Sequence, residues 1–302
     1  MPKKLKTSNV SFLNYSYAGN TIGSHSRQLA ELSEMKNDLQ KALQNNEFTL
    51  HYQPQIDLRT LDIIGIEALI RWNHPVRGQV PPIRFIPLAE KTGLIVPIGK
   101  WVLGEACHQA KSWQLAGCRP IRVAVNLSAC QFLEDDFVNV VKTILFESGL
   151  SPENVEFEIT ESMNLDAQKA ISKLKEIKEL GIFISIDDFG TGYNSFRYLK
   201  DFTVDKLKID KSFLSVDQSA NKTIVSSIIS MAHQLGIKVI GEGVETEEQL
   251  AFLQKANCDE AQGFLICKPL PPHEIEKFIQ KHEKNQRYPF FYNDKGKSIE
   301  KW

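Results

Sequence analysis

The stretch that decides the fold lies near the middle of the chain, at residues 155–160, and reads VEFEIT. Successive side chains of a β-strand point to opposite faces. One face of this run is therefore apolar throughout, whereas the other carries Glu158 near its carboxyl end. A strand of an open doubly wound sheet, which helices cover on both faces, would be almost continuously apolar. The pattern predicts a strand that helices cover on one face only.

The same split recurs along the chain in runs that alternate with helical periodicity. The other strand-like runs are residues 48–53, 63–71, 121–128, 182–187, 205–210 and 237–242. Helical spacing of apolar residues marks residues 28–44, 99–115, 136–148, 166–180, 221–235, 246–254 and 272–282. Strands that alternate with helices over about 240 residues predict a parallel α/β fold.

Most of these polar faces carry their ionisable or amide residue late in the strand. The residues in question are Glu67, Asn126, Glu158, Asp187, Lys208 and Glu242. A barrel has helices only outside, and its active site lies at the carboxyl ends of its strands. In the alternative, an antiparallel sheet, these faces would contact water, but helices between nearly all of the runs disfavour it. The sequence predicts an α/β barrel.

Composition excludes several classes of protein. The 302 residues are 42% hydrophobic and 24% charged, which is typical of a globular chain. The formal net charge of -1 provides no global basic field, so we expect no nucleic-acid polymer as partner. Five cysteines without a C-x-x-C pair argue against a disulfide framework. No apolar run approaches the roughly 18 residues of a membrane span, and the first residues lack a signal-peptide core. We expect a cytoplasmic chain without a membrane span.

The predicted barrel mouth collects more acids than bases. The acids are Glu67, Glu158, Asp187, Asp188 and Glu242, against Lys208 and Arg71. Three excess negative charges in one pocket are costly unless carboxylates take up protons or cations enter. Oxygen ligands from carboxylates and the Asn126 amide suit Mg²⁺ or Mn²⁺ rather than zinc.

This set of residues predicts phosphodiester chemistry. The adjacent pair Asp187-Asp188 can bridge two metal ions, an arrangement that stabilises both the attacking and the leaving oxygen. Arg71 can hold a phosphate oxygen, and Lys208 can orient the attacking water. A covalent route is disfavoured because no nucleophile has an evident activating histidine. An Asp-Asp pair by itself is more often a solvated turn, so the set is more specific than any member.

Several motifs in one order resemble those of EAL domains, the cyclic di-GMP phosphodiesterases of bacteria. The first is Glu67-Ala68-Leu69, within YQP at 52–54 and EALIRWNHP at 67–75. The others are FIPLAE at 85–90, NLS at 126–128, EITE at 158–161, DDFGTGY at 187–193, LKID at 207–210, EGVET at 242–246 and QGF at 262–264. The likeness covers roughly residues 39–282.

The resemblance implies a TIM-like (β/α)8 barrel whose first strand is antiparallel to the rest. It implies an enzyme that uses two metal ions, Mg²⁺ or Mn²⁺, to hydrolyse cyclic di-GMP to linear pGpG. We divide the chain into an N-terminal extension (1–34), the EAL domain (35–282) and a polar tail (283–302). We expect a homodimer that is either a stand-alone protein or part of a longer one.

The resemblance also implies roles for individual residues. Glu67, Asn126, Glu158 and Asp187 resemble ligands of the first metal, and Asp187 and Asp188 resemble the bridging and second-metal ligands. Lys208 resembles the lysine that contacts the water. Glu242 matches a glutamate assigned either as general base or as a metal-linked residue that orients water. Catalysis is thus assigned to Glu242, Lys208 and Glu67.

The remaining matches concern substrate and a loop. Gln53, Leu69, Arg71, Asp210 and Gln262 match substrate-binding positions, and Gln262 also matches a contact to metal-bound water. Glu161 and Glu245 resemble residues that anchor the loop at 188–195, which in this family covers the site and contributes to the dimer contact. Asn194 stands where many members have Ser.

Two other functions remain open at this point. One is a receptor or scaffold that binds cyclic di-GMP without turnover, and the other is a related phosphodiesterase for another substrate such as pGpG. No position of the metal and water set is substituted, which favours the active enzyme.

Overall fold

A computed structural model describes residues 23–160, 167–190, 204–214, 219–284, 291–292 and 298–299. Eight strands form a closed ring in the order β1-β9-β8-β7-β6-β5-β4-β2, which returns to β1. They are β1 (Phe48–Asp57), β2 (Ile63–His74), β4 (Arg122–Leu127), β5 (Val155–Thr160), β6 (Phe183–Phe189), β7 (Lys206–Ile209), β8 (Lys238–Gly241) and β9 (Glu260–Ala261). The predicted α/β barrel is confirmed.

The first strand runs against all of its neighbours. β1 is antiparallel both to β2, with Gln53 opposite Glu67, and to β9, with Ile56 opposite Ala261. The other strands of the ring pair in parallel. The family resemblance implied this departure from a uniform barrel, and it is confirmed. Outside the ring, β3 (Gly78–Val80) pairs with β2, and β10 (Phe291–Tyr292) pairs with β11 (Ser298–Ile299).

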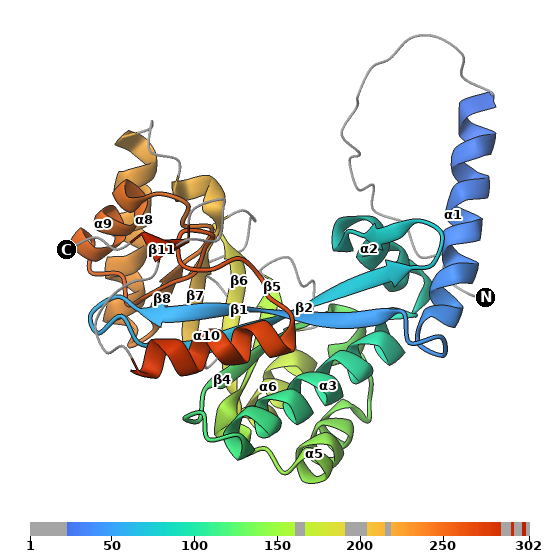
Figure 1. The fold of residues 1–302 in the computed structure, drawn as a ribbon, viewed down its shortest axis with the longest axis horizontal. Helices are drawn as coiled ribbons and strands as arrows, with labels where there is room; N and C mark the ends of the chain where they lie inside the picture. Colours follow the sequence, from blue (N-terminus) through green and yellow to red (C-terminus); the bar gives the residue numbers. More distant parts are fainter. Residues whose placement is uncertain are drawn as a thin grey trace.

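Helices cover the outside of the ring (Figure 1). They are α1 (Gly23–Ala42), α2 (Pro82–Thr92), α3 (Ile95–Leu115), α4 (Ala129–Leu133), α5 (Phe137–Ser148), α6 (Ala167–Glu179), α8 (Ser219–Gln234), α9 (Glu247–Lys255) and α10 (Pro272–Lys284). Two single turns of 3₁₀ helix are η1 (Pro152–Asn154) and η2 (Lys211–Leu214). In Figure 1, α10 lies along β1, whereas α1 stands beside α2 at the far end of the long β1–β2 pair.

The hydrophobic core lies between the strands and these helices. The outward side chains Val155, Phe157 and Ile159 of β5 are buried there, as are Ile98 and Val102 of α3. Burial of apolar surface of this kind is the main favourable contribution to folding. The face of β5 that is apolar in the sequence is therefore the outer face of the barrel.

The interior of the barrel is polar instead. Small residues such as Gly65, Ala124 and Ser185 occur there, beside buried charged and amide side chains. An α/β barrel more often fills its interior with branched apolar side chains. We call the residues near the carboxyl ends of the parallel strands the upper ring: Gln53, Glu67, Asn126, Glu158, Asp187, Lys208, Glu242 and Gln262. We call those beneath them the lower ring: Gln55, Arg122, Glu156, Lys206 and Glu260.

The sequence predictions missed several elements of the fold, among them β9 and α2. The strand β9 has only two residues, which is too short to show an alternating pattern. The helix α2 begins with Pro82 at its first position and contains Pro87, so its sequence does not show a regular helical signal. Proline at the first helical position is tolerated because its missing N–H would have no partner within the helix.

Two further observations concern the described residues. All five cysteines lie there, and each of them is free. In the same residues, no helix combines the length and the apolar character that crossing a bilayer requires.

Gly263, two residues after β9, lies so close to the backbone of Val244 that we expect it not to tolerate a side chain. A Cβ on Gly263 would overlap the backbone of Val244, whereas a Cβ on Gly104, within α3, would meet nothing within 4 Å. We expect Gly263→Ala to lower the free energy of unfolding by about 3 kcal/mol or more through overpacking. Gly104→Ala should raise it by about 0.5–1 kcal/mol, because alanine has less backbone freedom to lose. Urea unfolding of both variants measures this, and equal stability of the two would contradict the close contact at Gly263.

Candidate active site

A cavity of about 250 Å³ opens at the mouth of the barrel. Its lining comes from the ends of several strands and the turns that follow them: Gln53, Glu67, Leu69, Asp187, Lys208, Asp210, Lys211, Glu242, Gly243, Glu245, Gln262, Gly263 and Phe264. Most residues that the sequence assigned to catalysis, metal or substrate therefore share one cavity. Asn126, Glu158 and Asp188 adjoin it through contacts to these residues.

The ammonium group of Lys208 lies at the centre of the site. Its Nζ is 2.7 Å from Glu158 Oε2, 2.7 Å from Glu242 Oε1 and 3.1 Å from Asp187 Oδ1. The side chain is only 1% exposed. Burial lowers the pKa of Lys208, but the negative charge of Glu158 above all, and then of Glu242, holds it well above its usual range. Lys208 is thus a permanent cation that holds three carboxylates around one point.

Glu67 is held by two amides. Its Oε1 accepts a hydrogen bond from Asn126 Nδ2 at 2.8 Å, and its Oε2 accepts one from Gln262 Nε2 at 2.6 Å. Burial raises the pKa of Glu67, but the charge of Lys208 and these two hydrogen bonds outweigh it, and the net shift is downward. Glu67 is therefore an ionised carboxylate with a fixed orientation.

Other acids at the mouth have raised pKa values. Burial, followed by the charge of Glu67, raises the pKa of Glu158 well above its usual range. Burial also raises the pKa of Glu242 to about 8, although Lys208 acts in the opposite direction. The pKa of Asp188 is raised by burial and by the neighbouring Asp187. The single charge of Lys208 does not balance these carboxylates, so the site favours either protons or further cations.

Three of the acids are placed to hold a metal ion. Asp187, Asp188 and Glu242 each offer one carboxylate oxygen, and these oxygens lie within 4.8 Å of one another. Asp188 adopts a left-handed backbone with φ of 55°, and its N–H donates to Asp187 Oδ1 at 2.9 Å. Left-handed backbone at a non-glycine residue is uncommon and often occurs at functional sites. An all-oxygen set with excess negative charge fits a hard divalent cation such as Mg²⁺ or Mn²⁺.

The other predicted residues lie around this centre. Arg71 is half-buried beside the mouth, and its Nη1 donates to the Ile70 carbonyl at 3.0 Å. Burial lowers the pKa of Arg71, although Glu67 raises it. Asp210 Oδ1 accepts from the Ser212 N–H at 2.9 Å, and Glu245 is exposed at the rim. Glu161 and residues 191–195 of the predicted loop lie outside the described residues.

A second cavity, of about 530 Å³, adjoins the first and was not predicted. It lies between β2, β4 and the helices α2, α3 and α4. Leu69 lines both cavities, and Arg71 lines the second one only. Its walls are mainly apolar, and Ser128 Oγ donates there to Glu90 Oε1 at 3.0 Å. The motifs at 85–90 and 126–128 supply part of this lining, so they were the sequence signal that could have indicated a second cavity.

The lower ring was also missed. Lys206 Nζ lies 3.1 Å from Glu156 Oε2 and 2.7 Å from Glu260 Oε2, and Arg122 Nη1 lies 3.3 Å from Glu156 Oε2. Burial raises the pKa of Glu156, but Lys206 and then Arg122 bring it below its usual value. Glu156 and Lys206 each precede an upper-ring residue by two positions, so the alternation of the strand was the signal that could have found them.

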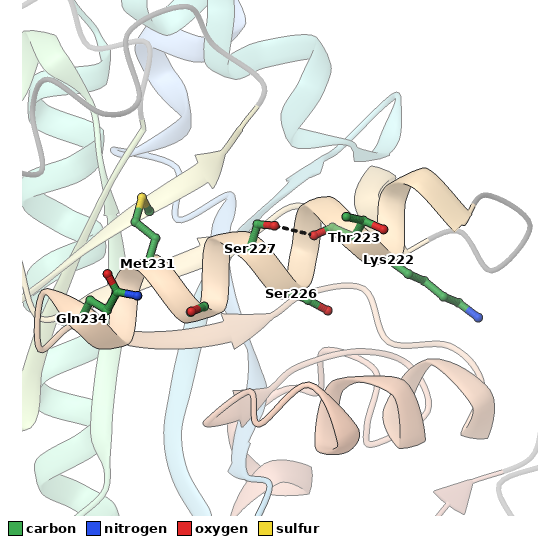
Figure 2. A pocket seen from close by; sticks show the side chains of 7 residues that line it. Lys222, Thr223, Ser226, Ser227, Met231 and Gln234 are labelled. Atoms are coloured by element: carbon green, nitrogen blue, oxygen red, sulfur yellow. Dashed lines mark hydrogen bonds between the residues drawn. The ribbon is translucent and has the colours of Figure 1, made fainter.

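A surface groove on α8 carries no comparable chemistry. Figure 2 shows that its lining side chains, from Lys222 to Gln234, all come from this one helix. The groove measures about 600 Å³. Ser227 Oγ donates within the helix to the Thr223 carbonyl at 2.8 Å. Because its lining holds no acid and no histidine, we do not assign a reaction to it.

Comparison with known proteins gives a consistent result. The family model described as "EAL domain" matches residues 36–269. The chain is 43% identical over 248 residues to the bifunctional diguanylate cyclase/cyclic di-GMP phosphodiesterase MucR of Pseudomonas aeruginosa. It is 38% identical over 250 residues to the cyclic di-GMP phosphodiesterase PdeR of Escherichia coli. These matches cover 81% and 82% of this chain.

The solved structures agree, although the curated relatives are longer. A structure described as "PaMucR Phosphodiesterase, c-di-GMP complex" superposes with a TM-score of 0.77 at 43% identity, covering 80% of this chain and 99% of that one. By contrast, the chain spans 36% of MucR and 38% of PdeR, about a third of the length of each.

The raised pKa of Glu242 predicts a pH-dependent stability of the metal-free protein. Glu242 titrates at about 8 in the fold but near its ordinary value of about 4.3 when unfolded. The folded state therefore binds more protons between these values, and the free energy of unfolding should fall as pH rises from about 5 to about 8.5. Urea unfolding in chelator at several pH values measures the slope. Glu242→Gln should flatten it, whereas Glu179→Gln, at an exposed position of α6, should not. An unchanged slope in Glu242→Gln would show that the pH dependence of stability does not come from Glu242.

Proposed function

This chain belongs to the EAL domain family, and we propose that it is a metal-dependent phosphodiesterase that hydrolyses cyclic di-GMP to linear pGpG. The observation that carries this proposal is the convergence of Glu158, Asp187 and Glu242 on Lys208 at one barrel mouth, with Glu67 lining the same cavity. MucR and PdeR, both described as cyclic di-GMP phosphodiesterases, support the same activity and substrate. We assign it to residues 35–282, in a cytoplasmic homodimer.

We propose that the site holds two divalent cations, Mg²⁺ or Mn²⁺. Glu67, Asn126, Glu158, Asp187, Asp188 and Glu242 would hold them. Such ions supply Lewis-acid charge to the phosphodiester and make water a stronger nucleophile. The excess of carboxylates over Lys208 and Arg71 supports the assignment, because cations would replace the protons that raised pKa values otherwise retain.

The chain's own residues would perform the remaining steps. Lys208, held by three carboxylates, would orient the attacking water and offset charge on the phosphoryl group. Water forms one P–O bond as the ester P–O bond to the leaving ribose oxygen breaks. The leaving oxygen takes up a proton to become a hydroxyl, and the proton lost by water must be accepted nearby. Glu242, with a pKa of about 8, is suited to accept it because that value lies close to neutral pH.

Arg71 and the second cavity would bind the rest of the substrate. Arg71 lines the second cavity two residues past Leu69, which lines both cavities, and its guanidinium can hold a non-bridging phosphate oxygen there. The second cavity has apolar walls and a polar pair, Glu90 with Ser128, which suits a flat purine base with hydrogen-bonding edges. We propose that one guanine of cyclic di-GMP occupies it.

The test of the activity is product analysis with and without Mn²⁺. We expect conversion of cyclic di-GMP to pGpG that stops in chelator. Glu67→Gln removes a charge without changing shape, and we expect it to lower kcat/KM by about 100-fold or more, since metal ions contribute several kcal/mol to such reactions.

A matched control is Glu153→Gln, at an exposed position in η1, which should keep full activity. Binding of cyclic di-GMP by calorimetry with no cleavage after prolonged incubation with Mn²⁺ would instead identify a receptor that binds without turnover. Faster cleavage of pGpG than of cyclic di-GMP would identify a different substrate.

The base pocket makes a separate prediction. Ile86 is half-buried in the wall of the second cavity. Ile86→Trp should fill part of the cavity and raise KM for cyclic di-GMP by about 10-fold or more, at an unchanged Mn²⁺ requirement, since a lost base contact is worth at least about 1.4 kcal/mol. Steady-state kinetics measures this. A KM equal to that of the unsubstituted chain would place the base elsewhere.

A further inference from the structure

We propose that Lys206 and Gln55 of the lower ring are positioning residues, which set the direction of the hydrogen bonds that reach Glu67 and Glu158. The proposal rests on the proposed function, because it assigns to the lower ring a part in arranging the metal-binding carboxylates. The lower ring lies beneath the mouth, where its residues would support the site without contacting the substrate.

Lys206 is the first donor in this series of hydrogen bonds and sets their direction. Its ammonium group is buried and lies 3.2 Å from Gln55 Oε1, besides its ion pairs with Glu156 and Glu260. A lysine ammonium only donates hydrogen bonds. The partner atom of Gln55 must therefore be its oxygen, and the amide nitrogen must point away from Lys206.

The nitrogen of Gln55 then faces two upper-ring residues. Gln55 Nε2 donates to Gln262 Oε1 at 3.0 Å and lies 3.5 Å from Glu158 Oε1. Gly65, opposite Gln55 in the β1–β2 pair, leaves room for this side chain, since a Cβ there would lie 2.7 Å from Gln55 Oε1. The position of Gln55 across the barrel thus depends on the absence of a side chain at Gly65.

The same logic orients Gln262. Its oxygen is used by Gln55, so its Nε2 donates to Glu67 Oε2 at 2.6 Å and to Gln53 Oε1 at 3.2 Å. Gln53 supports this arrangement because its own Nε2 donates to the Cys267 carbonyl, 2.9 Å away. A reversed Gln262 would place an amide oxygen against the ionised Glu67. Hydrogen bonds therefore run in one direction, from Lys206 through Gln55 and Gln262 to Glu67.

The two lower-ring members of this relay each lie two positions from an upper-ring residue on the same strand. Gln55 follows Gln53, and Lys206 precedes Lys208. Side chains two apart on a strand share a face, so the lower ring lies directly beneath the site. Hydrogen-bond partners of metal-binding residues commonly set the orientation and affinity of the site, and their loss costs about 10–100-fold in metal affinity or activity.

The experiment compares Gln55→Met, Gln55→Glu and the control Lys238→Met. Gln55→Met removes the relay while keeping a side chain of similar length. Gln55→Glu keeps the bond to Lys206 but presents an oxygen where the nitrogen faces Glu158 and Gln262. Lys238, at the rim of the lower ring, lies 3.6 Å from Glu260 and is largely exposed, so its loss leaves Gln55 untouched.

We expect Gln55→Met to lower kcat on cyclic di-GMP and weaken Mn²⁺ binding in calorimetry by about 10–100-fold, with KM changed by less than about threefold. Gln55→Glu should lower kcat and Mn²⁺ affinity further, and Lys238→Met should have the same kcat and Mn²⁺ affinity as the unsubstituted chain. A second readout needs no turnover: the side-chain N–H resonances of Gln262 in NMR spectra should move when Gln55 is replaced and stay in place in Lys238→Met.

The outcomes separate the two proposals. If the unsubstituted chain does not cleave cyclic di-GMP, the proposed function fails, and the Gln262 resonances alone decide on the relay. Folded Gln55→Met and Gln55→Glu proteins with unchanged kcat, Mn²⁺ affinity and Gln262 resonances would overturn the relay. If Gln55→Met does not fold, the isosteric Gln55→Glu decides the question.

Discussion

The site depends on one buried cation. Lys208 lies inside the barrel with Glu158, Asp187 and Glu242 within 3.1 Å or less of its ammonium group. Removing one member of a buried ion pair leaves the charge of the other uncompensated, which strongly destabilises the fold. The carboxylates and the lysine are therefore mutually required, and this mutual requirement keeps reactive acids at the mouth of a folded barrel.

A charged interior constrains the rest of the fold. Because polar side chains fill the barrel, the hydrophobic core must lie outside, between strands and helices, which is why residues such as Phe157 point outward. Gly65 leaves room for the side chain of Gln55 inside the barrel, and the small, buried Ser185 lies beside Lys206 in the β6–β7 pair. Fixed dipoles and charges of this kind can stabilise charge in a transition state without reorganising. The two polar rings are thus both a structural constraint and the basis of the proposed chemistry.

Much of the site was predictable from two local features: the alternation of side chains along each strand and the position of each residue within its strand. A period of two placed Glu67, Glu158 and Lys208 on inward faces, and their late positions in the strands placed them at one mouth. The family resemblance added the antiparallel first strand, which local periodicity does not show. The five residues of the lower ring went unpredicted, although the alternation of the predicted strands includes Arg122, Glu156 and Lys206, because only residues late in each strand were assigned to the site.

The sequence by itself determined the strands, their inward and outward faces and the acidic character of the mouth, because these follow from the chemistry of residues close together in the chain. Only the tertiary structure decided how the ring closes, through the two-residue β9 pairing with β1 about 200 residues away. It alone showed the cavity between β2 and α3 and the direction of the amides from Lys206 to Glu67. The physical reason is that contacts between distant segments and the orientation of a side-chain amide depend on three-dimensional neighbours, which no local pattern specifies.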